Sequence, residues 1–425
     1  MKPKTKFENK KLKHSRKKEM LIILLIGLMI ISGIYVYTYI IYYPVYSGKY
    51  PRINLTCDED PNYDDYIDCT FQLDYKGDSE SVDPMNAKIK IRGSGTGWNE
   101  FSPKKGYRLS LNQPKTLLGM REDDDWLLLE MYSDFPRMRF KLAFELYKTL
   151  TPSNPTAIAP NSEYINLFIN GEYQGLYLLA ERNDRRLYRL DDTTGNIDSS
   201  LIFQSKGHNN FQTYNPLTWD QDWPNDYEGI YIMDPILSEL IQFVSESNNE
   251  EFFNTESGIF SKFDELNLID FYIFNFFILH DDFWDKNYYL VRNTNPSKFF
   301  LVPWDYDRCF GQYAWNRWDA DRNEESNIRQ LNFLFNRLLD NDDFKKNVKA
   351  RWYNLRYNIW AEQSIVDILY DIYKDVEDIL KIETDKWNPG DMKSEWENDV
   401  DESVEYLFEW IPKRLNFCDT YFEIF

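Results

Sequence analysis

The stretch EYINLFINGEYQGLYLLAER, residues 163–182, carries the clearest local structural signal in this chain. Two runs of β-type pattern flank Asn170-Gly171, the residue pair that two-residue hairpin turns prefer. The stretch therefore predicts two antiparallel strands. On its N-terminal side, AKIKIRG (87–93) and GYRLSLN (106–112) alternate in the same way, and they predict further strands.

Helical patterns dominate the second half of the chain. Helices are expected over residues 136–150, 236–244, 266–279, 328–339, 344–361, 364–382 and 399–417. Ser364 and Asp367 resemble a capping box. YYLVR (288–292) and KFFLVPW (298–304) predict a strand pair between the helices, and 186–230 is expected to be a long irregular insertion. A strand-rich first half and a helix-rich second half indicate an α+β fold in two lobes.

The charge distribution narrows the class of partner. Net charge is −21 over 425 residues, while the first 20 residues carry nine Lys or Arg against two Glu. The rest of the chain is therefore strongly acidic and would repel nucleic acid. It suits a basic partner, or a site that works with bound cations.

The segment 21–43 contains no charged residue and is long enough to span a bilayer as a helix. A basic tail (1–20) precedes it and five tyrosines crowd its far end, as in membrane anchors with the positive flank inside. We therefore expect a single-pass membrane protein with a cytoplasmic N-terminus and its main domain outside the cytoplasm. Residues 44–86 are expected to form an acidic stalk or N-terminal extension.

Four cysteines follow this segment. Cys57 and Cys69 are expected to form a disulfide if the compartment is oxidising. The sequence has no CxxC and no Cys/His cluster, which argues against a structural zinc site.

Candidate chemistry begins at FILHDDFWDKNYYL, residues 277–290, where an apolar helix runs into Asp281 and Asp282. Asn287 follows five residues after Asp282, and the next strand ends in Trp304-Asp305-Tyr306-Asp307. Carboxylate and amide oxygens are the ligands that Mg²⁺ prefers, so Asn287 with Asp305 or Asp307 is a candidate metal site. The spacing His-x-Asp-x4-Asn is also that of the protein-kinase catalytic loop. The plainer alternative is a loop cap and a turn.

Basic residues near the glycine turn GSGTG (93–97) could meet phosphates. Lys104 and Lys105 precede a predicted strand that carries Arg108. The alternative is a solvated strand edge, and the turn lacks the GK[ST] ending of a P-loop.

Six ordered blocks together resemble the spore coat protein H (CotH) kinase family. They are IKIRGSGTGW, SPKKGYRLSL, YSDFPRMRFKLAFEL, LFINGEYQGLYLLAER, DDFWDKNYYLVR and FFLVPWDYDRCFG, from about residue 87 to 311. The resemblance implies a divergent bilobal protein-kinase-like fold that binds ATP and Mg²⁺ and phosphorylates Ser or Thr of a protein. It would divide residues 87–425 into a small lobe (87–185) and a large lobe (186–425).

The resemblance also implies roles for individual residues. Asp282 would be catalytic, with Asp281 as the alternative. The implied ATP-binding residues are Lys104, Lys105, Arg108, Arg139 and Glu181, and the implied metal ligands are Asn287, Asp305 and Asp307. Asp134 matches the family's acidic residue in the block that contains Arg139. Pro136 stands where members commonly have Ser.

Two hypotheses follow. The first is a membrane-anchored atypical protein kinase, because the residue types needed for phosphoryl transfer are all present. The second is a non-catalytic surface adhesion or scaffold protein that retains the CotH fold, because ATP is scarce outside the cytoplasm.

Overall fold

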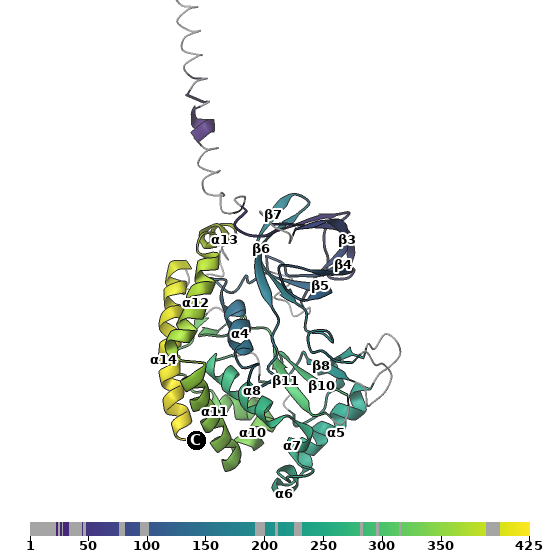
Figure 1. Cartoon of the computed structure of the whole chain (residues 1–425), viewed down its shortest axis with the longest axis vertical. Helices are drawn as coiled ribbons and strands as arrows, with labels where there is room; N and C mark the ends of the chain where they lie inside the picture. The colour runs from purple at the N-terminus through teal and green to yellow at the C-terminus, as the bar shows by residue number, and fades with distance from the viewer. Residues whose placement is uncertain are drawn as a thin grey trace, which may run out of the picture.

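The computed structural model describes residues 48–387 and 400–425 apart from short gaps, together with a few residues between 23 and 45. The gaps are 76–80, 94–101, 192–199, 209–210, 225–231, 281–283, 295–296 and 314–315. A barrel of strands adjoins a larger region of helices around a second sheet (Figure 1). The fold is therefore α+β, as predicted.

The barrel is built from the first seven strands of the chain. They are β1 (Arg52–Cys57), β2 (Ile67–Asp74), β3 (Val82–Ile91), β4 (Tyr107–Thr116), β5 (Glu122–Leu129), β6 (Ser162–Ile169) and β7 (Glu172–Glu181). Their order is β1-β2-β3-β4-β5-β7-β6, and a parallel pairing of β1 with β6 closes the barrel. Two of these strands, β1 and β2, come from the stretch 44–86.

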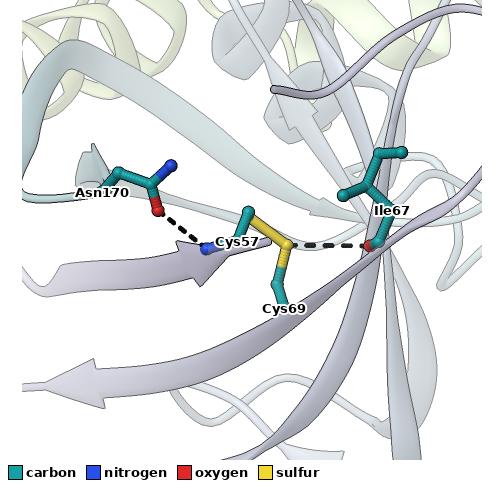
Figure 2. Close-up of a disulfide and its surroundings, with 4 residues drawn as sticks. All are labelled: Cys57, Ile67, Cys69 and Asn170. Atoms are coloured by element: carbon teal, nitrogen blue, oxygen red, sulfur yellow. Dashed lines mark hydrogen bonds between the residues drawn. A yellow bond between two sulfur atoms is a disulfide. The ribbon is translucent and has the colours of Figure 1, made fainter. Parts of the chain in front are cut away.

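The predicted hairpin is confirmed as β6 and β7. Asn170 and Gly171 have φ values of 51° and 81°, as a turn with two left-handed residues requires. Asn170 also holds β1, because its side-chain oxygen accepts a hydrogen bond of 2.8 Å from the Cys57 N–H (Figure 2). The predicted disulfide between Cys57 and Cys69 is confirmed, and it links directly paired positions of β1 and β2 (Figure 2).

A second, four-stranded sheet lies in the helical region. Its order is β11-β10-β8-β9, with bounds Phe299–Pro303, Tyr288–Arg292, Leu201–Ser205 and Trp219–Trp223. The β10–β11 pair is confirmed. The expectation of an irregular insertion over 186–230 is wrong in part, because β8, the short helix η1 (Pro216–Thr218) and β9 lie within it. A small two-stranded sheet joins β12 (Gln312–Tyr313) to β13 (Asn316–Arg317).

The helices form where their patterns predict, with two corrections. Their bounds are α4 (Arg139–Lys148), α5 (Met233–Glu246), α6 (Asn249–Phe252), α7 (Ile259–Lys262), α8 (Glu265–Phe277), α9 (Glu325–Leu331), α10 (Phe333–Leu339), α11 (Asp342–Asn358), α12 (Glu362–Val376), α13 (Leu380–Trp387) and α14 (Val400–Glu423). The expected helix 328–339 is broken where Asn332 accepts a hydrogen bond from the Phe335 N–H and starts α10. The expected helix 364–382 is split into α12 and α13, and Ser364 lies inside α12, so the capping box is wrong.

The helix α8 is the centre of the larger core. Every residue from Asn267 to Phe277 is buried, which explains why its sequence is apolar on all sides. It packs against β11 and α11. Its C-terminal end is therefore held in the core.

The expected membrane anchor over 21–43 is not found. Within the described part of the chain, no helix is long and apolar enough to cross a membrane. The predicted single-pass membrane location is corrected on that ground. Most of residues 21–43 lie outside the described residues.

Candidate active site

Asn287 and Asp305 lie side by side at one end of the second sheet. Tyr288 of β10 pairs with Pro303 of β11. One step beyond that pair, the Trp304 N–H donates a hydrogen bond of 2.9 Å to the Asn287 carbonyl. This bond places Asn287 opposite Trp304, the residue before Asp305, although Asn287 and Asp305 are 18 positions apart in the chain.

Both residues adopt a backbone conformation that is uncommon for side chains other than glycine. The φ angles are 60° at Asn287 and 68° at Asp305. Asn and Asp tolerate this left-handed region better than most residues. Such conformations cost free energy and concentrate at functional sites, so the paired occurrence marks this sheet end as a candidate site.

The Trp304–Asp307 segment alternates between the core and a more open side. Trp304 and Tyr306 are buried and pack on Phe144 of α4, with ring centroids 5.9 and 5.6 Å away. Asp305 and Asp307 are only half-buried. The segment is therefore anchored by its aromatic residues, and its carboxylates stay accessible.

The backbone of Asp305 is also contacted by His280, which follows the end of α8. A ring nitrogen of His280, Nε2, lies 2.8 Å from the Asp305 carbonyl oxygen. His280 is itself buried, and its ring packs edge-on against Tyr306. The backbone at Asp305 is thus held from two sides.

Arg139, the first residue of α4, belongs to the same neighbourhood. Its guanidinium donates to Asp134 over 2.7 Å, and its backbone N–H donates to the other oxygen of that carboxylate over 2.8 Å. Burial raises the pKa of the Cys309 thiol, and the charges acting on that thiol are Arg139, Asp134 and Asp307. Asp134 therefore balances the buried charge of Arg139.

Lys104 lies in a different, fully buried group of charges. Its ammonium donates to Glu383 of α13 over 2.7 Å and to the Leu176 carbonyl of β7 over 2.6 Å. Arg137 lies 3.4 Å from the same Glu383 oxygen. Burial lowers the pKa of Lys104 to about 8, and Arg137 acts in the same direction while Glu383 opposes it.

Lys105 and Arg108 do not join this group. The Lys105 ammonium lies 5.7 Å from the ring centroid of Tyr63, and the backbone of Lys105 accepts a hydrogen bond from Tyr177. Arg108 is exposed on β4. The neighbouring predicted lysines thus occupy distinct environments, and Lys104 alone of the two pairs with Glu383.

Arg108 instead acts electrostatically on residues of the second sheet. Its charge acts on Asp222 of β9 and on Tyr289 of β10. Burial raises the pKa of Asp222 to about 6, against the opposing influence of Arg182 and Arg108. Arg182 also reaches Asp125 over 3.4 Å. These residues form a charged seam between the barrel and the second sheet.

Glu181 is the last residue of β7. One carboxylate oxygen accepts from the Arg121 N–H at 3.0 Å, and the other accepts from the Asn161 N–H at 2.8 Å. The side chain is buried. Its oxygens hold the ends of neighbouring segments together.

The donor set fits a hard cation in its chemistry. Asn287, Asp305 and Asp307 offer one amide and two carboxylates, and Mg²⁺ commonly takes one or two carboxylates with phosphate oxygens and water. No cluster of three His, Cys, Asp or Glu side chains suited to a metal occurs among the described residues.

A sequence model of the family described as CotH kinase protein matches residues 89–418. The chain belongs to this family. The recognition made from the six sequence blocks is thus confirmed.

The individual proteins that this CotH chain resembles share only low sequence identity with it. The inner spore coat protein H of Bacillus subtilis (strain 168) is 26% identical over 289 residues, covering 63% of this chain and 71% of that protein. The Helicobacter pylori proinflammatory kinase CtkA is 10% identical with a TM-score of 0.29, covering 75% of this chain and 94% of that one. The Golgi casein kinase with Mn/ADP bound is 11% identical with a TM-score of 0.28, covering 89% and 75%. TM-scores this low support no statement about the activity of this chain.

Two predicted features of the CotH chain fall outside the described residues. They are Asp282, with its alternative Asp281, and the glycine turn beyond Gly93. Their place relative to Asn287 and Asp305 stays a prediction.

Three residues of the region were not predicted from the sequence: Glu383, Arg182 and Asp222. Asp222 sits in WDQDW, whose alternation is a strand signal inside a stretch that reads as irregular. Arg182 is the last residue of the stretch that predicts the hairpin. Glu383 has no comparable local signal, because its partner Lys104 lies far away in the sequence.

Proposed function

We propose that this CotH-family chain is an atypical protein kinase that transfers the γ-phosphate of ATP to a Ser or Thr hydroxyl of a protein. The observation that carries the proposal is the pairing of Asn287 with the Trp304–Asp305 backbone at one sheet end. Protein kinases hold Mg²⁺ with an Asn and an Asp contributed by two such segments. Family membership supports the same class of activity.

In this proposal Asn287, Asp305 and Asp307 would hold Mg²⁺, which would neutralise the phosphates of ATP. Asp282 orients the acceptor hydroxyl and takes its proton. The hydroxyl oxygen forms a bond to the γ-phosphorus while the bond from that phosphorus to the bridging oxygen of ADP breaks. Phosphoryl transfer depends mainly on positioning and charge stabilisation, so a small set of residues suffices.

Lys104 is the proposed phosphate-binding lysine. Protein kinases require an ion pair between a lysine of the strand-rich lobe and a helical glutamate. The pair of Lys104 with Glu383 on α13 has this character, with an N···O distance of 2.7 Å. Arg108 is proposed to add positive charge at the seam, and Lys105 is proposed as a peripheral phosphate contact.

Arg139 and Glu181 are proposed to support the residues that bind the nucleotide. Arg139 supports the Asp305–Asp307 segment through Asp134, and Glu181 fixes the end of β7. The division into a small lobe (87–185) and a large lobe (186–425) is part of the proposal, with the nucleotide at the seam between them.

The substrate is proposed to be a basic or Ser/Thr-rich protein, because the acidic chain would attract it at long range. The Bacillus subtilis relative is named as an inner spore coat protein. We extend a coat-associated setting to this chain as part of the proposal.

Nucleotide binding tests the proposal directly. The thermal unfolding of the chain would be followed with ATP, with and without Mg²⁺. Ligand at one hundred times its Kd adds about 2.7 kcal/mol of stability, which gives a clear upward shift of Tm. The shift should require Mg²⁺ and should disappear in Asp305→Ala.

The matched control is Asp321→Ala, which removes an exposed aspartate of the same region. It should keep the full Mg²⁺-dependent shift. If ATP shifts neither the parent chain nor the control, the kinase proposal fails and the non-catalytic adhesion or scaffold function becomes the better one. If the parent chain binds ATP, transfer of labelled phosphate to a basic protein such as a histone would identify the acceptor residue.

A further inference from the structure

Arg92 directly follows β3 and directly precedes the glycine turn that begins at Gly93. Its backbone N–H donates a hydrogen bond of 2.9 Å to the Gly106 carbonyl. This bond extends the pairing of β3 with β4 one step beyond Ile91 and Tyr107. The backbone of Arg92 is therefore held by the barrel, and the proposed function assigns no role to its side chain.

The side chain of Arg92 reaches from the barrel to the second sheet. Side chains alternate along a strand, and Ile89 and Ile91 of β3 pack in or against the barrel core. Arg92 therefore lies on the outer face of the barrel. Its guanidinium carbon is 5.8 Å from the centre of the Trp304 ring, and Trp304 directly precedes the predicted metal ligand Asp305.

No ion pair balances the charge of Arg92 among the described residues. There, its guanidinium contacts the ring of Trp304. Glu130 lies close by, because a Cβ added at Gly106 would collide with the Glu130 carboxylate and meet the Cγ of Arg92 at 3.0 Å. The two charged groups nevertheless form no ion pair with each other. Arg92 thus brings an uncompensated positive charge to this sheet end.

The guanidinium of Arg92 is accessible to a ligand. The residue is half-buried, and its nitrogens are not among the enclosed polar atoms that lack a partner in the described part of the chain. Since these nitrogens make no hydrogen bond there, each of them keeps accessible surface. A guanidinium beside an aromatic ring can still direct its N–H donors as a fork at a phosphate.

Tyr289 of β10 lies beside the same space. Its ring centroid is 6.5 Å from that of Trp304, and the residue is only 6% exposed. Its hydroxyl has no hydrogen-bond partner among the described residues, yet it is not fully enclosed. Burial raises the pKa of this hydroxyl. One carboxylate raises the pKa further and three guanidinium groups lower it, namely those of Asp222, Arg182, Arg108 and Arg92. The excess of positive charge favours an anion at this place.

We propose that Arg92 binds the terminal phosphates of the nucleotide from the barrel side. The assignment rests on the proposed function, because it takes the seam between the barrel and the second sheet as the nucleotide site. Two oxygens of one phosphate accept hydrogen bonds from the guanidinium fork, and the phosphate supplies the negative charge that Arg92 otherwise lacks.

Calorimetric titration of the full chain with ATP and Mg²⁺ tests this contact. Arg92→Ala should weaken the affinity for ATP at least tenfold. Arg92→Lys keeps the charge without the fork and should recover only part of the affinity. The matched control is Arg52→Ala, which removes a half-buried arginine of β1 that lies 3.9 Å from the centre of the Phe168 ring. It should change the affinity less than twofold.

Titration with ADP identifies the phosphate that Arg92 contacts. Equal losses of affinity for ATP and ADP in Arg92→Ala would place the contact on the β-phosphate. A loss for ATP alone would place it on the γ-phosphate, and either result supports the assignment. Full ATP affinity in Arg92→Ala would overturn it while leaving the kinase proposal intact. A parent chain that binds no ATP would overturn both.

Glu130→Gln separates phosphate binding from a purely structural role of Arg92. If Arg92 binds phosphate, Glu130→Gln should change the ATP affinity by the same factor in the parent chain and in Arg92→Ala. The Tm of the free Arg92→Ala chain should also stay close to that of the parent, since no ion pair is lost. A recovery of Tm and ATP affinity that Glu130→Gln brings only to Arg92→Ala would show that Arg92 merely balances Glu130, which would overturn the assignment.

Discussion

Lys104 and Glu383 are 279 positions apart in the sequence and form an ion pair of 2.7 Å in which both side chains are almost completely buried. The pair joins the segment before β4 to α13, which lies beside the barrel (Figure 1). Glu383 also accepts a hydrogen bond of 2.7 Å from the Leu176 N–H of β7. One carboxylate thus connects the C-terminal helices to the barrel.

Glu383→Gln should destabilise the chain strongly. It leaves the Lys104 and Arg137 charges buried without a carboxylate, and breaking a buried pair in this way costs about 3–5 kcal/mol. Chemical denaturation measures the change. Glu409→Gln, which breaks the exposed pair with Lys413, is the control and should have no measurable effect. Equal midpoints for Glu383→Gln and the parent chain would contradict the structural role of the pair.

Gly175→Ala should be more harmful than Gly171→Ala. Both glycines have positive φ, 114° and 81°, so alanine strains the backbone at either position. At Gly175 the new methyl group would also collide with Glu383 and meet the Trp387 ring nitrogen at 2.6 Å, whereas nothing lies within 4 Å at Gly171. The difference in unfolding free energy therefore isolates the close approach of α13 to β7. Similar losses in both variants would contradict it.

Asp222 should make stability depend on pH below neutrality. Its folded pKa is raised from 3.8 to about 6, so the folded chain binds more protons than the unfolded chain between these values. This group's contribution to stability is therefore lost as pH rises from 4 to 6. Asp222→Asn should gain on the order of 3 kcal/mol relative to the parent chain between pH 4 and pH 7. A constant difference across this range would refute the raised pKa.

Asp282→Asn should separate chemistry from binding. If Asp282 orients the acceptor hydroxyl, its amide variant should lower kcat at least a hundredfold while the ATP affinity changes little. Asp305→Ala should instead abolish the Mg²⁺-dependent ATP binding itself. Asp281→Asn is the matched control for the neighbouring carboxylate. A greater loss of kcat in Asp281→Asn than in Asp282→Asn would exchange the two assignments.

The disulfide should stabilise the barrel. Replacing Cys57 and Cys69 with Ser should cost about 2–3 kcal/mol, as expected for closure of a short loop. Dithiothreitol should lower the parent chain to the stability of this variant and leave the variant itself unchanged. A response of the variant to reductant would show that the effect lies elsewhere.

The parts of the fold that were predicted correctly carry their information locally. Asn170-Gly171 specifies its turn through the backbone preferences of the pair itself, and α8 is recognisable because its apolar run is long. The strands β8 and β9 are only five residues long. The alternation of WDQDW in β9 is a strand signal, but it is short and lies within a stretch that otherwise reads as irregular. The Ser364 capping box is wrong because α12 starts earlier, at Glu362, and has no side-chain cap.

The candidate-site residues also differ in whether a local sequence pattern could reveal them. Asn287 and Asp305 could be proposed together because each follows or precedes a recognisable strand. Glu383 could not, because its role depends on a contact that no local pattern encodes. For the segment 21–43 a local signal was present but misleading. Its composition predicted a membrane anchor that the described structure does not contain.

The closure of the barrel has a consequence for the order of events in biosynthesis. The strand β1 pairs in parallel with β6, whose residues leave the ribosome only after β2 to β5 and α4 have been made. Until then β1 presents an open sheet edge, which is a hazard for aggregation. Contacts between distant segments also slow folding. The nascent chain therefore passes through a stage in which protection of this edge, by a chaperone or by rapid translation, would decide the yield of folded protein.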